Sequence, residues 1–153
     1  PGHESTCFAA GPALLGGASD SATIDFTSAL SSNPLFTGKK IDYLGLYWGS
    51  MDDYNSITFY AGDDALLTLT GADVRAAAAV SGDQVAAGAN RYVNLTFDAH
   101  EQFTRLVFSA TSYAFELDNV AVRVADVPEP ATLGLMGVGA VGLAAAARRR
   151  RKA

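Results

Sequence analysis

Cysteine and histidine are scarce in this chain of 153 residues. Cys7 is the only cysteine, which excludes an intrachain disulfide and a multi-cysteine zinc site. His3 and His100 are the only histidines, and the sequence has neither a GxSxG nor an HExxH motif around which a hydrolytic site could form. The 16 acidic residues leave a carboxylate pair for glycoside hydrolysis open, but no pair stands out. We therefore expect that the chain is not an enzyme.

Basic residues are also scarce over most of the length. Before residue 127 the chain has six basic and 15 acidic residues, a formal charge of −9. Nucleic-acid binding needs clustered Lys and Arg to neutralise phosphates, and no such cluster occurs before residue 148. Nucleic acid is therefore excluded as a partner.

The chain changes character at residue 127. Four residues there form an extended break, because each proline biases its predecessor away from helix: Val127, Pro128, Glu129 and Pro130. Residues 131–147 then contain no charged side chain, and 17 residues in a helix span about 25 Å. We expect a single transmembrane helix over 131–147.

Five consecutive cations follow this apolar stretch: Arg148, Arg149, Arg150, Arg151 and Lys152. Such a block cannot enter a protein core, but it can act as a stop-transfer signal at the negative inner leaflet. The positive-inside rule places this block in the cytoplasm and the body of the chain on the other side of the membrane.

A Val-Pro-Glu-Pro break, a glycine-rich apolar segment and an arginine block, in that order, resemble the PEP-CTERM sorting signal. The resemblance implies export by a Gram-negative bacterium, with the body periplasmic while the chain is held in the inner membrane. It implies that an exosortase, a membrane protease, recognises residues 127–130 and cleaves the chain, which then reaches the cell surface or the extracellular space. The family's association with extracellular polysaccharide and biofilm implies a role in matrix or adhesion. A permanently membrane-anchored periplasmic domain remains the alternative.

The residues from 20 to 126 alternate between short apolar runs and turn residues. The expected strands cover residues 22–27, 41–48, 56–61, 66–70, 91–97, 103–109 and 113–124. Strands at this spacing predict an all-β body, an antiparallel β-sandwich or jelly roll. Residues 1–19 are expected to form an irregular lead-in and residues 127–153 the sorting tail. The alanine-rich stretch 76–87 is interpreted as a loop or short strand, because Gly82 and Asp83 interrupt it.

The last expected strand contains a change of periodicity. Three of its apolar residues share one parity and the next three share the other: Tyr113, Phe115 and Leu117, then Val120, Val122 and Val124. A strand cannot change faces without an extra residue, so we expect a β-bulge near Asp118 and Asn119. The segments 115–119 and 44–55 also resemble the β-sandwich bodies of exosortase-dependent surface proteins.

Two candidate binding sites follow from these strands. Glu116, Asp118 and Asn119 offer hard oxygen ligands for a structural calcium ion, although Asp118 and Asn119 could instead satisfy backbone groups at the bulge. Tyr43 and Tyr47 share a parity and could stack against sugar rings, although a mixture of core and surface aromatics is the alternative. Asp52 and Asp53 are interpreted as turn residues. A carbohydrate-binding module is therefore an alternative role for the body; no cofactor other than calcium is expected.

Overall fold

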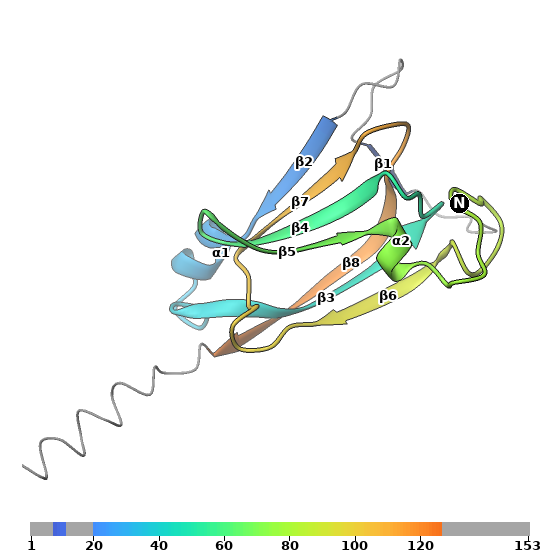
Figure 1. Cartoon of the computed structure of the whole chain (residues 1–153). Coiled ribbons are helices and arrows are strands. Elements are labelled where there is room, and N and C mark those ends of the chain that lie inside the picture. Colours follow the sequence, from blue (N-terminus) through green and yellow to red (C-terminus); the bar gives the residue numbers. More distant parts are fainter. Residues whose placement is uncertain (1–7, 12–19, 127–153) are drawn as a thin grey trace, which may run out of the picture.

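The computed structural model describes residues 8–11 and 20–126. Within these ranges the chain forms eight strands and two short helices (Figure 1). The strands are β1 Ala9–Ala10, β2 Asp20–Asp25, β3 Lys39–Gly49, β4 Asn55–Ala61, β5 Asp64–Thr70, β6 Arg91–Thr96, β7 Arg105–Ala110 and β8 Glu116–Asp126. The helices are α1 Thr27–Ser32 and α2 Gly71–Val74.

The strands form two four-stranded antiparallel sheets, in the orders β1-β8-β3-β6 and β2-β7-β4-β5. The first strand pairs with the eighth, the second with the seventh, the third with the sixth and the fourth with the fifth. This is the pairing of a jelly roll, in which one long folded ribbon wraps into two facing sheets. The predicted all-β antiparallel body is therefore confirmed.

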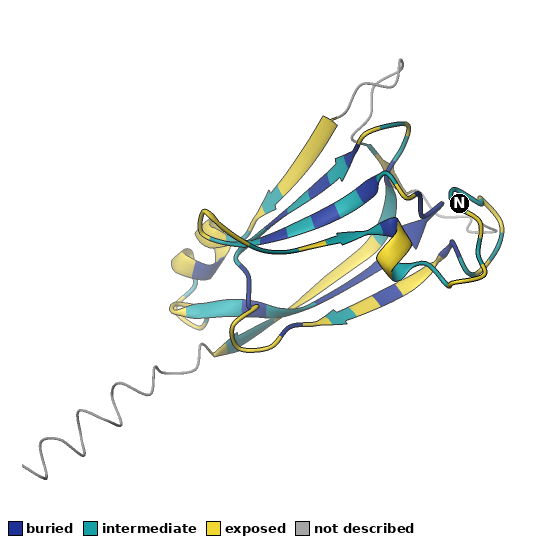
Figure 2. Cartoon of the chain, in the orientation of Figure 1, coloured by how far each residue is buried: buried dark blue, intermediate teal, exposed yellow. Residues whose placement is uncertain are grey.

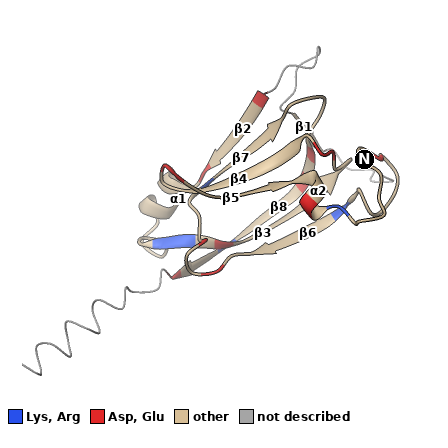
Figure 3. Ribbon diagram, viewed as in Figure 1, with Lys and Arg blue, Asp and Glu red and all other residues tan. Residues whose placement is uncertain are grey.

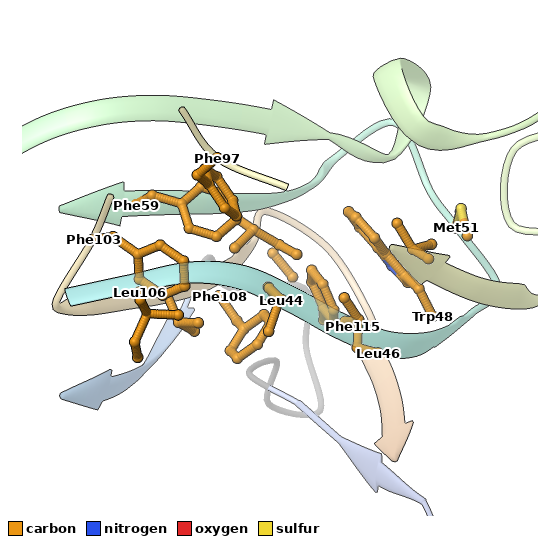
Figure 4. Packing of buried hydrophobic residues seen from close by; sticks show 14 residues of the cluster. Leu44, Leu46, Trp48, Met51, Phe59, Phe97, Phe103, Leu106, Phe108 and Phe115 are labelled. Carbon is orange, nitrogen blue, oxygen red and sulfur yellow. The ribbon is translucent and has the colours of Figure 1, made fainter. Parts of the chain in front are cut away.

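The core lies between the two sheets (Figure 2). On β3, Leu44, Leu46 and Trp48 point inward and are fully buried, as their alternation predicts. The Trp48 ring stacks on Phe115 with 4.6 Å between ring centroids. Phe59 and Phe103 pack edge to face at 5.0 Å farther along the core (Figure 4). Because the largest buried side chains come from both sheets, the core joins the two sheets.

The predicted bulge in β8 is present. Gly45 pairs with Ala121 and Tyr47 pairs with Asp118, so Asn119 and Val120 together oppose the single residue between Gly45 and Tyr47. Asn119 has a φ of 51°, in the left-handed region that asparagine tolerates better than most residues. After the bulge, Val122 lies opposite Leu44 and Val124 opposite Ile41, so both return to the inward side of the sheet, although Val122 remains 37% exposed.

The structure adds three elements to the expected set: β1 and the two short helices α1 and α2. Ala9–Ala10 pairs with β8 as a short strand inside the segment expected to be irregular. Helix α1 was not predicted, because its six residues are too few for a helical period; it buries only Leu30, and its first amide, that of Thr27, donates to Asp25 Oδ1 at 2.8 Å. Between α2 and β6 the alanine-rich stretch contains turns and neither helix nor strand, which agrees with the loop interpretation.

The predicted transmembrane helix 131–147, the break at 127–130 and the cations at 148–152 lie outside the described residues. Among the residues that the structure describes, no helix is both long and apolar enough to cross a membrane.

The bulge generates a stability prediction at Asn119. Replacing it with alanine should lower the free energy of unfolding by about 1 kcal/mol, because alanine tolerates positive φ poorly. Replacing it with glycine should leave stability nearly unchanged. Urea unfolding of N119A and N119G measures both effects, and equal losses in the two variants would show that the asparagine side chain matters and the backbone conformation does not.

Candidate functional site

The outward side of the sheet β1-β8-β3-β6 carries a group of tyrosines. Tyr43 and Tyr47 alternate on β3 with the inward-facing leucines and Trp48. On the neighbouring strand β6, Tyr92 lies directly opposite Tyr47, and Asn94 lies opposite Gly45. Directly opposite residues of an antiparallel pair share a face, so these side chains form one surface. We call the set Tyr43, Tyr47 and Tyr92 the tyrosine face.

The tyrosine rings lie along the sheet because Gly45 leaves room for them. A Cβ added at Gly45 would come within 2.4 Å of the hydroxyl oxygens of both Tyr43 and Tyr92. The Tyr43 hydroxyl donates to Asn94 Oδ1 at 2.7 Å. The Tyr92 hydroxyl donates across β3 to the Asn119 carbonyl oxygen at 3.3 Å. Partial burial and the neighbouring Tyr43 hydroxyl raise the pKa of Tyr92, so its hydroxyl keeps its proton at physiological pH.

An ion pair borders the tyrosine face. The Arg123 guanidinium donates to both carboxylate oxygens of Asp42, at 2.9 and 3.1 Å. The same guanidinium lies 5.7 Å from the centroid of the Tyr43 ring. The face therefore combines ring surfaces with hydroxyl, amide and charged groups at their edges, a combination that suits stacking and hydrogen bonding to a polar ring such as a sugar.

The structure brings the predicted pair Tyr43 and Tyr47 onto one surface and adds Tyr92 to it. Tyr92 is 41% exposed. The signal for it was present in the sequence, because Tyr92 alternates with the inward Val93 on β6. Its place beside Tyr47 could not be predicted, because the two residues are 45 positions apart and the pairing of their strands is not visible in either strand alone.

A second site is a polar cavity of about 280 Å³ at the end of β3. We call it the acidic cavity; its described lining is Ser50, Asp52, Tyr54, Ser81, Gly82, Gln84, Tyr113, Ala114 and Glu116. The residues come from the turn after β3, from the loop before β6 and from the start of β8. Acidic side chains elsewhere in the described body lie mainly in loops and at strand ends (Figure 3).

Burial, together with neighbouring carboxylates, raises the pKa values of Asp52 and Tyr54 in the acidic cavity. Burial raises the pKa of Asp52, with the charges of Asp53 and Glu116 adding to the effect, against hydrogen bonds to Tyr54 and Ser81 that lower it. Burial, then the hydrogen bond and charge of Asp52, raise the pKa of Tyr54 to about 12. The Tyr54 hydroxyl donates to the Tyr113 carbonyl oxygen at 2.5 Å and remains neutral at physiological pH. The cavity is thus a region of negative potential.

Of the three residues of the predicted calcium site, Glu116 and Asp118 lie on the same side of β8, opposite Gly49 and Tyr47, and Asn119 lies in the bulge that follows them. Glu116 lines the acidic cavity, whereas Asp118 and Asn119 are not part of that lining. Asp118 Oδ1 accepts the Asn119 amide at 2.7 Å, the backbone role that was the alternative. In the described ranges 8–11 and 20–126, no three His, Cys, Asp or Glu side chains gather in a group that could hold a metal.

Comparison with known proteins identifies the C-terminal segment and finds no match for the body. No curated protein and no solved structure matches the chain. Residues 126–151 match the family model of the PEP-CTERM protein-sorting motif, beginning at the last residue of β8. The match covers the break, the apolar stretch and the arginines from which the sequence predicted this signal. The chain therefore carries a PEP-CTERM protein-sorting motif behind an all-β body of antiparallel sheets.

Proposed function

We propose that this is an exported surface protein whose body binds extracellular polysaccharide without catalysis. The observation that carries the proposal is the sorting motif at residues 126–151, which supports delivery to the cell surface by an exosortase. In this proposal the apolar residues 131–147 hold the chain in the inner membrane until cleavage, and the cations at 148–152 remain cytoplasmic. The body then contributes to extracellular matrix, biofilm or adhesion.

The tyrosine face supports polysaccharide as the partner. Three tyrosine rings on two adjacent strands offer flat apolar surface, and Asn94 and Arg123 offer hydrogen-bonding groups beside it. Sugar rings present an apolar C–H face and polar edges, so they match such a surface. Tyr92 is exposed and Tyr43 and Tyr47 are half-buried, and an aromatic surface of this kind favours a carbohydrate-binding body over a purely structural one.

Glycoside hydrolysis is the second candidate, because Asp52 and Glu116 line the same cavity. A pair of carboxylates is what that reaction requires. The proposal favours binding because the tyrosine face offers a surface for sugar rings without requiring this carboxylate pair.

The sorting proposal predicts a shortened mature chain. Expressed in an exosortase-carrying host, the protein should lose its C-terminal segment near residues 128–130, whereas an exosortase-deletion strain should retain the whole chain in the inner membrane. Mass spectrometry of the purified product measures the difference. An uncut chain in both strains would leave a permanently anchored periplasmic domain instead.

The binding proposal predicts losses at the tyrosine face. Y43A, Y47A and Y92A should each weaken binding to exopolysaccharide purified from that host by roughly two- to tenfold, since one aromatic contact contributes about 0.5–1.5 kcal/mol. Affinity electrophoresis in a gel containing the polysaccharide measures the effect. Y60A is the matched control, because Tyr60 lies on β4 in the other sheet, with its ring centroid 4.1 Å from the Arg105 guanidinium carbon. Equal losses in Y60A and the three variants would contradict the assignment.

The non-catalytic proposal predicts that the protein releases no reducing ends from the same polysaccharide. A reducing-sugar assay over a day at neutral pH measures this. Release by the unmodified protein that disappears in E116Q would replace binding with hydrolysis as the function of the acidic cavity.

A further inference from the structure

The acidic cavity carries two negative charges that no cation in its lining balances. Asp52 and Glu116 are its acidic residues, and none of the described residues that line it is Lys, Arg or His. The nearby Arg75 forms its ion pair with Asp53. A partly buried negative charge without a counter-ion is unfavourable, because burial removes the water that would stabilise it.

Two oxygen atoms in the lining lack hydrogen-bond partners. The Ser50 hydroxyl oxygen is buried in a residue that is 5% exposed, and it has no partner among the described residues. The Oε2 atom of Glu116 is also buried and has no described partner. Buried polar atoms in native proteins are nearly always satisfied, so these two oxygens beside the same cavity are suited to contact a bound group.

The surrounding backbone holds these oxygens in place. The Ser50 amide donates to Asn90 Oδ1 at 2.9 Å, and the Asn90 side-chain amide donates to the carbonyl oxygens of Asp83 and Ala86. Gly82 packs so closely on Asp52 that an added Cβ would lie 2.3 Å from its Oδ1 atom. The loop between α2 and β6 thus encloses the carboxylate that the turn after β3 provides, and the site is pre-formed.

We propose that the acidic cavity binds a divalent cation of the calcium type through Asp52, Glu116 and the Ser50 hydroxyl. Calcium takes six to eight oxygen ligands, and carboxylates, hydroxyls, carbonyls and water all serve. The lining is built from such oxygens and has no nitrogen or sulfur ligand of the kind that zinc prefers. A neutral sugar could satisfy the free acceptors, but it could not balance two negative charges.

This proposal differs from the calcium site predicted from the sequence. It retains Glu116, replaces Asp118 and Asn119 with Asp52 and Ser50, and moves the ion from the bulge to the cavity. It stands apart from the sorting and polysaccharide proposals, because it needs neither cleavage of the tail nor the tyrosine face.

Calcium titration of the full chain in mild detergent tests the site. Isothermal titration calorimetry should give one site with a dissociation constant on the order of 10⁻⁴ to 10⁻³ M, the range of extracellular calcium modules. Adding 10 mM Ca²⁺ to EDTA-treated protein should raise the unfolding temperature by roughly 5 °C. Terbium luminescence sensitised by Tyr54 provides an independent readout.

Four variants locate the ion. D52N and E116Q should each lower calcium affinity at least tenfold, whereas D118N, with the same loss of charge on the same strand as Glu116, should bind normally. S50G should weaken binding without lowering the unfolding temperature in EDTA, because Ser50 has a φ of 46° and glycine relieves it. S50G therefore tests the site even if D52N or E116Q fails to fold.

Two results would overturn the proposal. One is the absence of saturable Ca²⁺ or Tb³⁺ binding up to 10 mM in the unmodified chain. The other is a loss of binding in D118N as large as that in E116Q, which would return the ion to the bulge.

Discussion

The alternation of side chains along β3 is the constraint on which the other features depend. Each residue of a strand faces away from its neighbours, so Leu44, Leu46 and Trp48 cannot enter the core unless Tyr43, Gly45 and Tyr47 face outward. The same strand therefore fixes the packing between the sheets and the surface that the tyrosines form. Its last residue, Gly49, leads directly into Ser50, which places the acidic cavity at its end.

Local periodicity explains what could be predicted from the sequence. The strands, the jelly-roll class and the bulge follow from patterns of two residues, and the shift of parity between Leu117 and Val122 located the bulge correctly. Short elements escaped prediction: β1 has two residues and acquires its form only by pairing with β8. The sorting motif was recognisable because it consists of three unlike segments in a fixed order, without reference to tertiary structure.

The candidate sites could be predicted only where they lie on one strand. Tyr43 and Tyr47 belong to one strand and were found together, whereas Tyr92 joins them through pairing across a long separation. Asp52 and Glu116 are 64 positions apart and meet only because β3 and β8 are neighbours in the same sheet. The sequence instead grouped Glu116 with its chain neighbours Asp118 and Asn119. Proximity along the chain could not reveal Asp52, which approaches Glu116 only through the pairing of β3 with β8.

The length of β8 separates the cavity from the point where the sorting motif begins. Glu116 opens this strand and Asp126 closes it, so the ten steps between them cover about 33 Å at the rise of an extended chain. The sorting motif starts at Asp126, whereas Glu116 lines the cavity at the other end of the strand. The cavity therefore lies roughly 30 Å from the first residue of the sorting motif, measured along β8. The carboxylates of the cavity and the charge at the start of the sorting motif are therefore separated by about four Debye lengths at physiological ionic strength, so neither appreciably changes the electrostatic potential at the other.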